Sequence, residues 1–192
     1  RLAAALPAGS AVLGAAMDLG TTKLAIYLLD LNTGGTLAAV GVMNPQIAYG
    51  EDVISRISYA NRGREQRRQL QTLLVGAVNQ AVQSECARLG LDPAQIVEYV
   101  AVGNTAIHHL FCGLEVEQLG RAPYVALADH ALDLRAAELG LVGSPGARVY
   151  LPPNIAGYVG ADHVSALAAS QEHLAQSPAL LVAIGTNTEI SL

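Results

Sequence analysis

Short apolar runs separated by turn residues begin the sequence and predict three β-strands. The segment Lys23–Asp30 (KLAIYLLD) is almost continuously apolar, which is the pattern of a buried strand. Residues 15–20 and 36–43 form similar runs on either side of it, and the turn at 32–35 (NTGG) contains residues that tolerate a positive φ. Three strands joined by such tight turns predict an antiparallel meander.

Further along the chain, apolar residues recur every three or four positions, which predicts helices. One helix is expected at 51–60 and a long one at 64–89, which Gly90 can end because glycine readily adopts the left-handed conformation. The remaining pattern predicts strands at 96–102, 148–151 and 179–184, and helices at 106–111, 132–139 and 162–170. Together these elements predict an α/β fold with a mixed, α+β-like sheet.

The amino-acid composition mainly excludes classes of protein. With 52% hydrophobic and 14% charged residues, the chain is too apolar to be intrinsically disordered. The net charge of −5 argues against nucleic-acid binding, and the one dense basic cluster, at 62–68, is expected to be the solvated start of a helix. No long uninterrupted apolar run predicts a membrane span. Cys86 and Cys112 form no CxxC pair, which is typical of a cytoplasmic protein.

A short motif occurs twice, each time at the end of a predicted strand. Residues 18–22 (DLGTT) and 183–187 (AIGTN) both combine an apolar strand end with a glycine and then hydroxyl or amide residues. The backbone N–H groups and side-chain donors of such a turn can face a phosphate. Two copies on matching strands predict a duplicated fold with a nucleotide between the halves.

The first motif resembles the first phosphate motif of the ASKHA superfamily (acetate and sugar kinases, heat-shock chaperones, actin), and 185–187 resembles the second. Within that superfamily, three longer segments resemble the reductive activators of corrinoid proteins. These are NPQIAYGEDVISRISYAN at 44–61, GNTAIHHLFCG at 103–113 and LPPNIAGYVGADHVSALA at 151–168. The resemblance covers about residues 15–192, which is nearly the whole chain.

The resemblance implies an RNase H-like, actin-like fold. Its first half would be complete at 15–150, its second half would begin at 151–192 and be truncated, and residues 1–14 would be a linker. It also implies ATP-dependent reduction of a Co(II) corrinoid protein of a methyltransferase system to Co(I), with a homodimer as an open option. The electron would come from a [2Fe–2S] cluster for which this chain has no ligands, so a fragment of a longer protein is expected.

The same resemblance assigns roles to the first loop. Asp18 would hold Mg²⁺ through water, because hard cations prefer oxygen ligands. Gly20 would let the backbone approach the phosphates of ATP, and Thr21 and Thr22 would donate hydrogen bonds to them. Lys23, the only lysine of the chain, would add a point charge or else be the solvated first residue of a strand.

The second loop would contribute Gly185, Thr186 and Asn187 by the same resemblance. The aspartate that usually begins this motif is replaced by Ala183, which leaves ATP hydrolysis in question. Asp162 is the second catalytic candidate, because it could orient an attacking water or the shell of the metal. A helix N-cap is the alternative interpretation of Asp162.

Other polar residues allow more than one interpretation. His108 and His109 are adjacent, so on a helix they diverge by about 100° and seldom share a metal ion; packing or surface positions are expected. A polar block between a predicted strand and a predicted helix could line the cleft or contact a partner; it consists of Asn44, Gln46, Tyr49, Asp52 and Arg56. Two other functions therefore stay open beside the activator: a docking or dimerisation domain with vestigial loops, which Ala183 favours, and a small-molecule kinase, which the similarity at 44–61 disfavours.

The expected absence of half the nucleotide site limits the affinity of this chain for ATP. Micromolar binding corresponds to about 8 kcal/mol, so losing half of it leaves about 4 kcal/mol, which is a millimolar Kd. We expect the chain by itself to bind ATP at millimolar concentration and not to hydrolyse it. Calorimetric titration measures the affinity, and a micromolar Kd would contradict this expectation.

Overall fold

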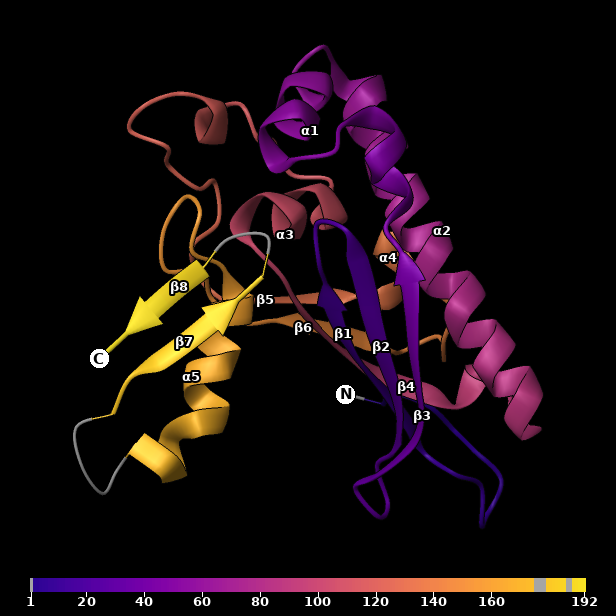
Figure 1. The fold of residues 1–192 in the computed structure, drawn as a ribbon. Helices are drawn as coiled ribbons and strands as arrows, with labels where there is room; N and C mark the ends of the chain where they lie inside the picture. The colour runs from indigo at the N-terminus through magenta and orange to yellow at the C-terminus, as the bar shows by residue number, and fades with distance from the viewer. Residues whose placement is uncertain (1, 175–178, 186–187) are drawn as a thin grey trace.

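The computed structural model describes residues 2–174, 179–185 and 188–192, and Figure 1 shows how their elements are arranged. Six strands form one mixed sheet in the order β3-β2-β1-β4-β6-β5, and two further strands form a separate hairpin. The strands are β1 (Leu13–Leu19), β2 (Lys23–Asp30), β3 (Gly35–Met43), β4 (Ile96–Val102), β5 (Leu132–Arg135), β6 (Arg148–Leu151), β7 (Leu181–Ile184) and β8 (Thr188–Ser191).

Strand directions confirm the predicted meander and mixed sheet. β1, β2 and β3 pair antiparallel, whereas β4 runs parallel to β1 and β6 runs parallel to β4. β1 is therefore hydrogen-bonded along both edges and lies in the middle of the sheet. The turn that follows it must emerge at the same edge of the sheet as the end of β4, because the two strands run in the same direction.

The helices cover the sheet and connect its strands. They are α1 (Val53–Ala60), α2 (Arg64–Leu89), α3 (Thr105–Cys112), α4 (Ala136–Leu139) and α5 (Ala161–Leu174), with short 3₁₀ turns η1 (Pro45–Tyr49), η2 (Pro93–Gln95) and η3 (Gln118–Gly120). As predicted, α2 ends at Gly90, whose φ is 68°. In the described part of the chain, no helix combines the length and apolar character needed to cross a membrane.

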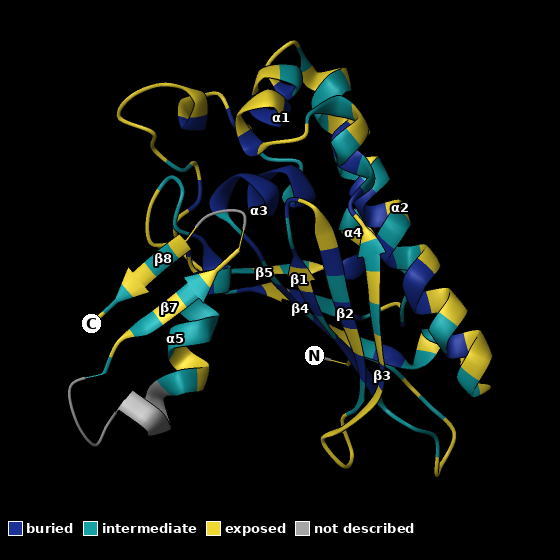
Figure 2. Cartoon of the chain, viewed as in Figure 1, coloured by how far each residue is buried: buried dark blue, intermediate teal, exposed yellow. Residues whose placement is uncertain are grey.

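The core lies between the sheet and the helices α2 and α3. Figure 2 shows α3 almost entirely buried, whereas α2 is buried only at separate positions along its length. Alternate residues of β1 are buried because successive side chains of a strand point to opposite faces. These are Leu13, Ala15, Met17 and Leu19. They belong to one apolar cluster with residues of α2 at helical spacing, including Leu70, Leu74 and Val78. The same alternation leaves Asp18 on the other face of the sheet.

The prediction of a helix at 132–139 is wrong for residues 132–135. Leu132–Arg135 form the edge strand β5, which pairs antiparallel with β6, and only 136–139 form the single-turn α4. Leu132 and Leu134 are half-buried while the charged residues between and after them are exposed, which is the alternation of a strand. Residues 132–135 form a strand because they hydrogen-bond to β6, which is not adjacent to them in sequence.

Helix α3 buries two adjacent histidines, so the packing interpretation is confirmed for both. His109 Nδ1 lies 2.7 Å from the carbonyl oxygen of Thr105, and its Nε2 accepts a hydrogen bond from the Ala128 N–H at 3.1 Å. Both ring nitrogens of His108 are buried and lack a hydrogen-bond partner among the described residues. Burial, with the neighbouring His109 as a smaller cause, lowers the pKa of His108 to about 4.

We expect His108→Leu to reduce the acid sensitivity of the fold. Between pH 6.5 and 4 the unfolded chain binds a proton at this position that the folded chain does not, so wild-type stability falls as pH decreases through that window. This shift in the pKa of His108 corresponds to about 3 kcal/mol of unfolding free energy, which is lost across the window. Urea unfolding at a series of pH values measures it, and His130→Leu, at an exposed histidine, is the control. Equal pH slopes for wild type and His108→Leu would contradict the prediction.

Candidate functional site

The turn between β1 and β2 is tight because Gly20 has no side chain. A Cβ on Gly20 would collide with the carbonyl oxygen of Lys23. Thr21 is buried, and its hydroxyl accepts a hydrogen bond from Asn104 Nδ2 at 3.1 Å. Asn104 also caps α3, since its Oδ1 accepts the Ile107 N–H at 3.0 Å. The turn is thereby fixed to the N-terminus of α3.

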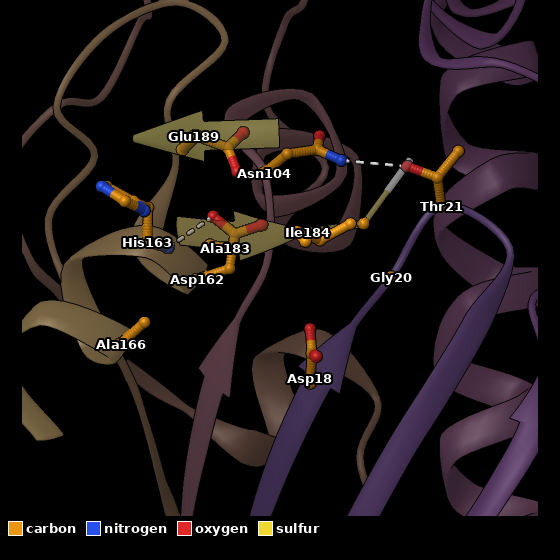
Figure 3. A pocket seen from close by; sticks show the side chains of 11 residues that line it. Asp18, Gly20, Thr21, Asn104, Asp162, His163, Ala166, Ala183, Ile184 and Glu189 are labelled. Atoms are coloured by element: carbon orange, nitrogen blue, oxygen red, sulfur yellow. Dashed lines mark hydrogen bonds between the residues drawn. The ribbon is translucent and has the colours of Figure 1, made fainter. Parts of the chain in front are cut away.

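A cavity of about 290 Å³ lies between this turn and the C-terminal hairpin (Figure 3). Asp18, at the end of β1, contributes a carboxylate to it, and Gly20 and Gly185 contribute backbone from the two motif loops. The remaining lining residues come from the neighbouring loop, α5 and the hairpin: Thr21, Asn104, Asp162, His163, Ala166, Ala183, Ile184 and Glu189. The fold therefore brings the two similar motifs to one cavity.

Three carboxylates line this cavity. Burial raises the pKa of Asp18 above its ordinary value, and the negative charge of Asp162 raises it further. Glu189 lies directly opposite Ala183 in the β7–β8 hairpin, so a carboxylate reaches the cavity from the strand next to the alanine. Among the described residues, no three metal-ligating side chains lie close enough to hold an ion alone. The arrangement suits a cation that keeps part of its water shell, as Mg²⁺ does.

The structure brings together five of the residues singled out from the sequence. Asp18, Gly20, Thr21, Asp162 and Gly185 all line the cavity, where their roles remain predictions.

The other candidates are placed differently. Thr22 and Lys23 are exposed, and their side chains do not line the cavity. A ligand at this turn could therefore contact their backbone rather than their side chains. Thr186 and Asn187 lie outside the described residues.

The N-cap interpretation of Asp162 is wrong. Helix α5 begins at Ala161, and the Asp162 N–H already points back to the carbonyl oxygen of Gly103. Its Oδ1 accepts the N–H of the next residue, His163, at 2.9 Å, whereas a cap would bond an N–H two or three positions further on. The Asp162 side chain instead lines the cavity within the electrostatic reach of Asp18.

Three polar lining residues were not predicted as site residues. Asn104 follows a strand and a glycine, so its role as a helix cap had a local signal, but its bond to Thr21 had none. His163 is buried, and its Nε2 lies 2.7 Å from Ser191 Oγ. Glu189 reaches the cavity only because the hairpin folds β8 against β7, and no local sequence pattern shows that pairing.

Comparison with known proteins agrees with this fold. A mixed sheet with a glycine–threonine turn after its first strand, at a carboxylate-lined cavity, is consistent with an actin-like, ASKHA-type protein. Within that class, residues 13–175 match the family model described as the RACo middle region, so the chain belongs to the RACo family.

Two relatives illustrate the similarity. A curated protein of Eubacterium limosum, corrinoid activation enzyme RamQ, is 32% identical over 181 residues, which cover 94% of this chain and 30% of the relative. A solved structure titled reductive activator for corrinoid, iron-sulfur protein has a TM-score of 0.89 and 34% identity, over 95% of this chain and 29% of that one. The chain thus spans less than a third of the length of either relative.

We expect Asp162→Asn to lower the pKa of Asp18. The substitution removes a nearby negative charge, whereas burial, the larger cause of the shift, remains. The pKa of Asp18 should therefore fall but stay above its ordinary value. Carboxyl ¹³C NMR during a pH titration measures it, with the exposed Asp129→Asn as control. An unchanged Asp18 titration in Asp162→Asn would show that the two carboxylates do not interact.

Proposed function

We propose that this chain is the nucleotide-binding region of an ATP-dependent reductive activator that returns a corrinoid protein from Co(II) to Co(I) for methyl transfer. The observation that carries the proposal is the convergence of the two glycine loops and the Asp18 carboxylate on one cavity. Membership of the RACo family and the printed names of both relatives support the corrinoid protein as partner.

In this proposal the cavity residues bind the phosphates of ATP and Mg²⁺. Asp18 holds the cation through water, since Mg²⁺ is usually bound by one or two carboxylates together with substrate phosphates. Gly20 admits the phosphates close to the backbone, and Thr21, Thr22 and Lys23 offer them backbone N–H groups. Asp162 orients the attacking water.

From the second loop, Gly185 lines the same cavity. Thr186 and Asn187 follow it in sequence and, by the resemblance, would donate hydrogen bonds to the same phosphates. This arrangement favours a division of the chain into a first half-domain at 15–150 and the start of a second at 151–192. The separate β7–β8 hairpin supports that division.

The size of the cavity supports binding of phosphates rather than of a whole nucleotide. Pockets that enclose a small-molecule ligand usually measure about 300–1,000 Å³, and this one, at about 290 Å³, is at the lower end. The ribose and base of ATP would therefore depend on residues beyond this cavity. That requirement agrees with the millimolar affinity expected for the chain by itself.

The cysteines of this chain do not fit an iron–sulfur cluster. Such clusters are held by four thiolates, and the chain has only Cys86 and Cys112. Burial raises the pKa of Cys112 to about 12, so this thiol stays protonated at neutral pH, and burial also raises the pKa of Cys86. The single electron that converts Co(II) to Co(I) on the partner must therefore be supplied by a one-electron donor outside these residues.

One observation favours a second candidate function, a docking domain with vestigial phosphate loops. The β7 position that usually carries a carboxylate is Ala183. Against this candidate, Glu189 lies opposite Ala183 and lines the same cavity, so the site still has a carboxylate on that side. Family membership argues against the small-molecule kinase.

The variants Asp18→Ala and Thr21→Ala distinguish the two functions in the full-length protein. If ATP drives reduction, both should still capture the corrinoid protein in a pull-down while losing at least about tenfold of the rate of Co(I) formation, the usual loss for a removed charged or phosphate contact. Absorption spectroscopy follows the cobalt state, and Asp129→Ala is the control. Unchanged reduction rates in both variants would favour the docking function.

A further inference from the structure

Three successive carbonyl oxygens of the turn between β1 and β2 are bonded by a single polar segment behind it. The Gly20 oxygen accepts from Asn44 Nδ2 at 2.9 Å, and the Thr21 oxygen accepts from Arg56 Nη2 at 2.7 Å. The Thr22 oxygen accepts from the backbone N–H of Asn44, also at 2.9 Å. The carbonyl side of the turn is therefore fully engaged.

This bonding fixes the direction of the N–H groups. In a trans peptide plane, the C=O of one residue and the N–H of the next point in opposite directions. The N–H groups of Thr21, Thr22 and Lys23 are consequently turned away from the segment that contains Asn44 and Arg56. Successive N–H groups on one side of a turn form a concavity that attracts anions.

Arg56 is an unusual residue for this position because it is completely buried. Its other two hydrogen bonds also go to neutral oxygens: Nε donates to the Gly50 carbonyl at 2.8 Å, and Nη1 donates to Gln46 Oε1 at 3.4 Å. Within residues 2–174, 179–185 and 188–192, no carboxylate lies at ion-pair distance from it. Burial lowers its pKa to about 10, so it remains charged at neutral pH.

A buried charge without a counter-ion destabilises a protein unless something compensates it. Here carbonyl and amide dipoles, one of which belongs to the Thr21 peptide, stabilise the charge, and the carboxylate of Asp52 favours it without forming an ion pair. An anion bound on the open side of the turn would interact favourably with both the N–H groups and the guanidinium behind them. The buried guanidinium of Arg56 behind the turn is therefore compatible with a negatively charged ligand on its open side.

We propose that Arg56 and Asn44 are positioning residues that hold the turn 20–22 in its anion-binding conformation for the polyphosphate of a nucleotide. The proposal rests on the proposed function for the identity of the ligand. It gives two residues of the polar block a role behind the turn, which differs from lining the cleft because neither Asn44 nor Arg56 lines the cavity. A residue that only anchored α1 would change stability without changing the turn.

The test compares Arg56→Gln with Gln46→Met in the full chain. Gln46 is equally buried and donates from Nε2 to the Leu70 carbonyl at 3.0 Å. Its side chain contacts no carbonyl of the turn, and its Oε1 accepts only the longest of the three Arg56 hydrogen bonds, at 3.4 Å. It is therefore a matched control for loss of a buried polar side chain. NMR titration with inorganic triphosphate and with Mg²⁺–ATP measures affinity, and amide hydrogen exchange at 21–23 measures the order of the turn.

Arg56→Gln should weaken triphosphate binding by at least about tenfold and accelerate exchange at 21–23, and Arg56→Lys should recover part of both. Gln46→Met should stay within about twofold of wild type. Asn44→Ala, which releases the Gly20 carbonyl, replaces Arg56→Gln if that variant does not fold. Folded Arg56→Gln with wild-type affinity and exchange, or an equal loss in Gln46→Met, would overturn the proposal.

The same data separate this proposal from the proposed function. If wild type binds neither triphosphate nor Mg²⁺–ATP, the nucleotide function fails for this chain. Amide exchange at 21–23 still decides whether Arg56 orders the turn, because that measurement needs no ligand.

Discussion

A turn that presents its N–H groups to a ligand needs bonding partners for its carbonyl oxygens on the other side, because buried backbone groups without partners are costly. In this chain Asn44 and Arg56 supply those partners for the turn after β1. They can do so because the segment that connects β3 to α2 in the chain, which forms η1 and α1, brings both side chains to the turn. The geometry of the candidate site therefore depends on a polar cluster that itself lies outside the cavity.

The cavity combines opposite electrostatic demands. Its carboxylates, Asp18, Asp162 and Glu189, repel a polyphosphate, whereas the N–H groups of the turn attract one. A divalent cation reconciles the two, since it can interact with the carboxylates through water and with phosphate oxygens directly. Burial is the larger cause of the raised pKa of Asp18, and the negative charge of Asp162 raises it further.

The central sheet positions one side of the cavity, and the C-terminal elements form the other side. β1 is paired along both edges and buries one face, so its exposed face and its end are fixed relative to the core. α5 and the β7–β8 hairpin complete the cavity from the other side, through residues that contact the first sheet near the turn after β4. In our proposal the electron is supplied from outside this region, because Cys86 and Cys112 are too few to hold an iron–sulfur cluster.

The sequence by itself determined the meander, the helices at 51–60 and 64–89, and the positions of the glycine turns. Hydrophobic periodicity, turn chemistry and the helix cap at Gly90 all act locally. It also determined the family, since the segment at 44–61 is specific. Only the tertiary structure decided that 132–135 is a strand, that Asp162 faces the cavity, and that Glu189 lies opposite Ala183. Those features depend on how strands pair and on how α5 and the hairpin lie against the first sheet, which local periodicity cannot encode.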